Sequence, residues 1–190
     1  ILMRKLISFL LFVFLSASLS TAYSSPFDLS TKKQYDEVPQ FENFRYWYGD
    51  IQYGFITYLG LSDVSGFETE LHLHFAGKKP TRMTLILGPG GLTEDSCISD
   101  YKAVVKLLNQ KYGNYQNQNV TKDPLIDDLI AVSVCVPVRT ELYTIDTYWR
   151  TKGRTIVASL IGDGEGYYIE IDHIFSRSLS HPLKKLKNTL

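Results

Sequence analysis

Residues 68–75, ETELHLHF, alternate strictly between polar and apolar side chains. Because successive side chains of a strand point to opposite faces, a strand with this pattern has one apolar face and one polar face. The turn-forming residues 76–80, AGKKP, come next, and residues 81–88, TRMTLILG, provide a matching apolar face. The apolar positions of the two segments are Leu71, Leu73, Phe75, Met83, Leu85 and Leu87. Together they predict an antiparallel β-hairpin with one buried face.

Three more runs rich in β-branched and aromatic residues lie in the last third of the sequence. They are residues 142–150 (LYTIDTYWR), 154–162 (RTIVASLIG) and 167–175 (YYIEIDHIF), and glycine-containing turns separate them. Runs of this composition favour strands, and short connections favour antiparallel neighbours. The last third of the chain is therefore predicted to form a β-meander.

One segment has the period of a helix instead. In residues 99–113, SDYKAVVKLLNQKYG, the apolar side chains recur about every 3.6 positions, whereas lysine and glutamine occupy the other side. The apolar positions are Tyr101, Val104, Val105, Leu108 and Tyr112. Gly113 follows the last of them, where a glycine commonly ends a helix. An amphipathic helix that packs on one face of the sheet is the expectation.

The rest of the chain completes the predicted α+β fold. Residues 114–124 are polar and predict a loop, and the alternating residues 129–138, LIAVSVCVPV, predict a strand. The prediction is thus a mainly antiparallel sheet of about seven strands with one helix on one face. Residues 44–176 form its single domain, after an irregular arm at residues 23–43 and before a basic tail at residues 177–190.

The first residues predict export. Residues 1–22 contain Arg4 and Lys5, then an apolar run at residues 6–15, then small side chains, which is the pattern of a secretory signal peptide. The run is shorter than the roughly 20 residues that a membrane-spanning helix needs. We therefore expect a periplasmic or secreted protein with no stable membrane insertion.

The two cysteines predict a disulfide, and the net charge of the chain bears on which partners it can attract. Cys97 and Cys135 have no metal-site spacing, and an exported chain keeps disulfides, so we expect these two to be bonded to each other.

The formal net charge at pH 7 is zero. A chain with no excess positive charge has no long-range attraction for phosphate backbones, so no nucleic-acid partner is expected.

The layout resembles that of many small exported bacterial proteins of unassigned function. The resemblance lies in the ELHLHF…TRMTLIL hairpin, the helix ending LLNQKYG, and the later stretch TYWRTKGRTIVASLIGDGEGYYIEI. It covers roughly residues 68–175. It implies the fold and the compartment, and it transfers no catalytic residue.

An aromatic stretch, RYWYGDIQYGF, lies outside this resemblance at residues 45–55. Gly49 and Asp50 predict a hairpin-like turn between a strand at residues 44–48 and a strand at residues 51–59. About half of the rings are expected in the core, because large aromatic side chains bury much apolar area. The outward side chains are expected to form a contact surface for a protein partner, made of Tyr46, Trp47, Tyr48 and Tyr58. A glycan-binding surface on the first three of these is an alternative.

A metal-binding or hydrolytic site centred on His72 and His74 is the other alternative, and it ranks ahead of the glycan surface. His72 and His74 share one face of a strand with Glu70, and a His-x-His pair beside an acid is geometry that zinc sites use. The third ligand would have to come from elsewhere, for example Glu170, Asp172 or His173, which the sequence alone does not place beside the histidines. The other interpretation is an ordinary polar strand face that meets Arg82 and Thr84 across the hairpin.

The leading functional hypothesis is a non-enzymatic exported interaction protein, such as an inhibitor, an immunity-type protein or an envelope accessory factor. It would bind a protein partner through a face or an edge of its sheet. No Gly-x-Ser-x-Gly motif and no ordered serine, histidine and acid set occur in the sequence. No catalytic residue is predicted, and zinc at His72 and His74 is the one cofactor that an alternative would require.

Overall fold

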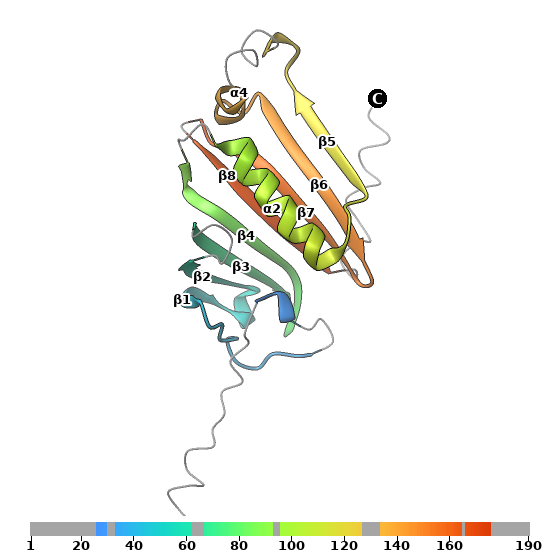
Figure 1. Ribbon diagram of the computed structural model, residues 1–190. Coiled ribbons are helices and arrows are strands. Elements are labelled where there is room, and N and C mark those ends of the chain that lie inside the picture. Colours follow the sequence, from blue (N-terminus) through green and yellow to red (C-terminus); the bar gives the residue numbers. More distant parts are fainter. Residues whose placement is uncertain are drawn as a thin grey trace, which may run out of the picture.

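The computed structural model describes residues 26–29, 33–61, 67–92, 96–126, 134–164 and 166–175. Eight strands within these ranges form one sheet in the order β1-β2-β3-β4-β8-β7-β6-β5, and every neighbouring pair is antiparallel (Figure 1). The strands are β1 (Phe44–Asp50), β2 (Phe55–Leu61), β3 (Glu68–Ala76), β4 (Lys79–Leu92), β5 (Asn117–Lys122), β6 (Tyr143–Thr151), β7 (Arg154–Gly162) and β8 (Tyr167–Phe175). The helices are α2 (Cys97–Tyr112) and α4 (Cys135–Arg139), with 3-10 turns η1 (Pro26–Asp28), η2 (Ile51–Tyr53) and η3 (Pro124–Ile126). The predicted α+β class is confirmed.

The hairpin and the meander form as predicted, and the last strand joins them. Leu71 lies opposite Leu85 in the β3–β4 pair, and Leu85 lies opposite Ile171 in the β4–β8 pair. These three side chains are buried on the same face of the sheet. Because β8 pairs with β4 at the centre, the two halves of the chain share one continuous apolar face.

Helix α2 covers this apolar face over β6, β7 and β8 (Figure 1). The hydroxyl of Tyr101 donates to the Ala158 carbonyl at 2.7 Å and contacts the Thr147 hydroxyl at 2.8 Å. At the other end of the helix, the Trp149 indole lies 3.0 Å from the Asn109 side-chain oxygen. These buried polar groups are hydrogen-bonded, as the low-polarity interior requires. The predicted amphipathic helix on one face of the sheet is confirmed.

The expected disulfide forms between Cys97, the first residue of α2, and Cys135, the first residue of α4. It closes a loop between residues 38 positions apart. On the chain-entropy model, closure of a loop of this length stabilises the fold by about 4 kcal/mol. It therefore ties the short helix α4 to the helix that covers the core.

The predictions for two segments were wrong. Residues 135–139 form helix α4 instead of the end of a strand. Pro137 explains the difference, because proline has no N–H to donate to a neighbouring strand. The first part of the predicted strand, residues 129–133, lies outside the described residues. The polar residues 117–122 form the edge strand β5 instead of a loop. All six β5 residues are exposed, so the strand has no buried face that would impose an apolar alternation.

The described part of the arm before β1 packs on the core. Leu29, Tyr35 and Phe41 are buried, and the Phe41 ring lies 5.2 Å from that of Tyr58.

The predicted signal peptide at residues 1–22 and the predicted basic tail at residues 177–190 fall outside the described residues. Within the described part, no helix is both long enough and apolar enough to cross a membrane.

Candidate interaction surface

The turn between β1 and β2 places aromatic side chains at one end of the sheet. Asp50 caps the 3-10 turn η2 by accepting a hydrogen bond from the Gln52 N–H at 2.9 Å. Gly54 ends the turn in the left-handed conformation, which glycine adopts without strain. A Cβ atom at Gly49 would lie 2.5 Å from the Phe55 carbonyl oxygen, so only glycine fits there. The second strand therefore begins at Phe55, not at residue 51 as predicted.

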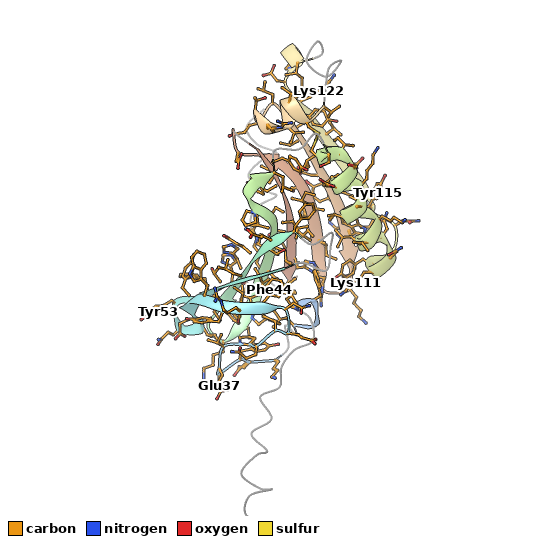
Figure 2. All side chains as sticks on the ribbon, turned by 60° about the vertical axis from the view of Figure 1, so that its left-hand side comes forward. Glu37, Phe44, Tyr53, Lys111, Tyr115 and Lys122 are labelled. Carbon is orange, nitrogen blue, oxygen red and sulfur yellow. A yellow bond between two sulfur atoms is a disulfide. The ribbon has the colours of Figure 1, made fainter. Side chains whose placement is uncertain are left out.

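Five aromatic side chains around this turn are exposed: Tyr46, Trp47, Tyr48, Tyr53 and Phe55, called the aromatic corner below. Trp47 is 54% exposed and Tyr53 is 74% exposed. In Figure 2, Tyr53 lies at the end of the sheet farthest from Tyr115, which is near the end of α2. Single exposed hydrophobic side chains are common on protein surfaces and need no explanation. Several exposed aromatic rings close together are instead typical of interaction surfaces.

A β-bulge splits the corner between the two faces of the sheet. Tyr46 lies opposite Tyr58, whereas Tyr48 lies opposite Thr57, so Trp47 is the extra residue on β1. The Tyr48 ring packs edge-on against Trp47 at 5.2 Å and against Phe55 at 5.7 Å. These three rings form a continuous group on the side of the sheet away from α2, here called the open face.

Tyr58 does not belong to the surface, contrary to the prediction. It is 0% exposed, and its hydroxyl donates to the Pro39 carbonyl at 2.7 Å. Burial raises the pKa of this hydroxyl well above its usual range. The arm residue Phe41 covers the ring, so Tyr58 holds the arm on the sheet and cannot contact a partner.

The open face continues from the corner as a row of polar side chains. The register places Tyr48, Thr57, His72, Thr84 and Asp172 opposite one another across five neighbouring strands. The side chains in and beside this row, called the polar patch, are Glu70, His72, His74, Arg82, Thr84, Glu170 and Asp172. The aromatic corner thus borders a charged surface without a break in the sheet.

Arg82 pairs with two of the carboxylates of the polar patch, Asp172 and Glu170. Arg82 donates from Nε to Asp172 Oδ1 at 2.7 Å and makes a second contact from Nη2 to Asp172 Oδ2. Its Nη2 also lies 3.4 Å from Glu170 Oε1, and the Thr84 hydroxyl donates to Asp172 at 2.6 Å. Burial and the neighbouring Asp172 carboxylate raise the pKa of Glu170, and Arg82 opposes that shift.

Two of the predicted metal ligands, Glu70 and His72, contact each other. Both ring nitrogens of His72 have neighbours: Nε2 lies 3.0 Å from Glu70 Oε2, and Nδ1 lies 3.3 Å from the Thr57 hydroxyl. Burial, Arg82 and His72 lower the pKa of His74. Among the described residues, no group of three His, Cys, Asp or Glu side chains is arranged to hold a metal ion. Within that part of the chain, the third ligand that a zinc site requires does not reach the histidines.

His173, the remaining candidate ligand, lies on the other face of the sheet. Its side chain is buried among apolar groups, with the Phe27 ring at 5.0 Å and the Tyr112 ring at 5.6 Å. The structure therefore brings Glu170 and Asp172 to the face of His72 and His74, and it separates His173 from them.

Sequence reasoning missed Tyr53 and Phe55 as members of the surface. The signal was present in the two glycines, Gly49 and Gly54, that bracket residues 50–53. Two glycines that close together favour a compact turn, and a tyrosine on a turn is exposed.

No family model, no curated protein and no solved structure matches this chain.

Proposed function

We propose that this protein is a non-enzymatic interaction protein that binds a protein partner through the aromatic corner, with the polar patch at the rim of the contact. The observation that carries the proposal is the set of exposed rings on β1, η2 and β2, of which Trp47, Tyr48 and Phe55 pack together on the open face. Tryptophan and tyrosine are the residues that most often dominate the binding energy of protein interfaces.

The geometry of the corner suits a preformed binding surface. The edge-to-face contacts among Trp47, Tyr48 and Phe55 restrict the rings before a partner arrives. Less side-chain entropy is then lost on binding. Arg82 and Asp172 beside the corner are already hydrogen-bonded to each other. A partner that covers part of the rim would therefore not leave either charge buried without a partner.

Side chains, rather than the backbone of β1, make this contact in our proposal. The bulge at Trp47 interrupts the regular register of β1, and a bulged edge pairs poorly with an added strand. A partner would therefore rest on the rings and on the open face beside them.

The geometry favours a protein partner over a glycan or a metal. A sugar ring stacks on a flat aromatic platform, but the planes of Trp47 and Tyr48 cross at 85°. The His72 ring nitrogens already have hydrogen-bonding neighbours, which a metal would have to displace.

Export is part of the proposal. The signal-like residues 1–22 and the Cys97–Cys135 disulfide support it, because disulfides persist in oxidising compartments. The partner would then be a protein of the cell envelope or of the surrounding medium.

Affinity capture with matched variants tests the proposal. The purified chain is immobilised and exposed to envelope extract and culture fluid of the source cells, beside Trp47→Ala, Tyr53→Ala and the control Tyr115→Ala. Tyr115 is an exposed aromatic residue outside the corner. We expect one stoichiometric partner on the native chain and on the control, and its loss on both corner variants. Equal capture by all four, or catalytic turnover by the purified chain, would contradict the proposal.

A further inference from the structure

The sheet has a second edge, β5, at the opposite end from the aromatic corner. In Figure 2, Lys122 at the end of β5 lies far from Tyr53. The β5–β6 register is regular over all six residues of the strand, from Asn117 opposite Tyr148 to Lys122 opposite Tyr143. The strand contains no proline and a single charged residue, Lys122. It therefore lacks the bulge, the proline and the central charge with which edge strands commonly prevent pairing.

The hydrogen-bond pattern shows which β5 groups face outward. The Asp123 N–H donates to the Leu142 carbonyl at 2.9 Å. In an antiparallel pair the backbone groups of successive residues point alternately toward and away from the neighbouring strand. The N–H and C=O groups of Asn119 and Thr121 therefore point to β6, and those of Gln118 and Val120 point away from the sheet.

We propose that β5 pairs with β5 of a second copy of this chain, antiparallel and about a two-fold axis at Val120. This register places Val120 opposite its own copy and overlaps the whole strand. Lys122 then lies opposite Gln118, and Asn119 lies opposite Thr121, so no like charges meet. The register centred on Lys122 would instead place two lysines opposite each other.

The side chains near the axis support self-pairing. Val120 is 50% exposed although it is an apolar, β-branched residue on a strand. It lies opposite the buried Ile145, so it is on the face that α2 covers. On the two-fold axis it would pack on its own copy, and both α2 helices would lie on the same side of one continuous sheet.

Sedimentation of the purified chain with two Val120 variants tests the proposal. Val120→Lys places like charges opposite each other on the axis, whereas Val120→Thr keeps a neutral β-branched side chain. We expect a concentration-dependent dimer for the native chain and for Val120→Thr, and a monomer for Val120→Lys at the same concentration. Thermal unfolding of each variant checks that the monomer remains folded.

Three results would overturn self-pairing. The first is a native chain that stays monomeric up to about 100 μM, a concentration at which even a weak specific dimer is populated. The second is a dimer that persists in Val120→Lys. The third is a dimer that Trp47→Ala abolishes, because that result would assign the contact to the aromatic corner. Partner capture through the corner does not depend on β5, so the two proposals can fail independently.

Discussion

The ring of Tyr48 packs edge-on against the ring of Phe55, 5.7 Å away on the neighbouring strand of the sheet. The ring of Tyr48 also packs edge-on against the ring of Trp47. Neither contact buries these rings, since all three stay exposed. The group is therefore ordered but solvated, and a partner that covers it removes apolar surface from water without first ordering the side chains.

Trp47→Ala is expected to weaken partner binding by at least about 30-fold, which corresponds to roughly 2 kcal/mol, the threshold of an interface hot spot. Stability should change little, because the side chain is more exposed than buried. Titration calorimetry with the captured partner and chemical unfolding of the variant measure the two effects. A stability loss as large as the binding loss would mean that Trp47 acts through the fold.

Tyr58→Phe is expected to lower stability and to leave partner affinity unchanged, the opposite of Trp47→Ala. It removes the buried hydrogen bond to the Pro39 carbonyl and should lower the free energy of unfolding by about 1 kcal/mol. Partner affinity should stay unchanged, because the ring is covered by the arm. Urea unfolding and the same titration check both parts. If Tyr58→Phe weakened partner binding while stability stayed the same, Tyr58 would belong to the binding surface after all.

His173 is expected to make stability depend on pH. Burial, Arg154 and Lys111 lower its pKa to about 3, against about 6.5 in an unfolded chain. The folded state therefore keeps His173 neutral, and the stability contribution is fully present above about pH 6.5. It is lost as the pH falls toward 3, at up to about 1.4 kcal/mol per pH unit.

The variant His173→Leu isolates this contribution, because leucine fills the apolar site and does not titrate. The free energy of unfolding, measured between pH 4 and pH 8, should fall less steeply with acid in the variant than in the native chain. Parallel curves for the two proteins would show that His173 does not cause the pH dependence.

Arg82→Met is expected to destabilise the protein by about 1 kcal/mol at neutral pH, a modest value because the guanidinium is partly exposed. Without Arg82, the pKa of Glu170 should rise further, since Arg82 is the group that opposes its upward shift. A raised pKa means that the ionised carboxylate is disfavoured in the folded state, so the destabilisation should shrink in acid. Carboxyl titration by NMR follows Glu170, and Arg150→Met, an exposed arginine on β6, is the control.

The sequence predicts the elements that have one buried face. The alternation at Leu71 and Leu73, and the helical period through Tyr101 and Leu108, both reflect burial, and both elements formed as predicted. Strand β5 could not be found in this way, because all of its side chains are exposed and none has to be apolar.

The membership of the surface was harder to predict, because both faces of β2 contain apolar residues. Tyr58 and Phe55 lie on opposite faces, and the alternation alone does not say which face the arm covers. The bulge at Trp47 adds one residue to β1, and each such insertion reverses the faces of the side chains that follow. Tyr58 is the buried ring because it lies opposite the buried Leu71 and because Phe41 of the arm packs on it.

The most direct test of the proposed interaction is the accessibility of Trp47 in the bound state. The chain has two tryptophans, and Trp149 is buried, so iodide quenching of tryptophan fluorescence reports mainly on Trp47. If the aromatic corner is the contact surface, saturation with the captured partner should lower the quenching constant nearly to that of a buried ring. Quenching that stays the same when the partner is bound would contradict this account and place the interface elsewhere on the molecule.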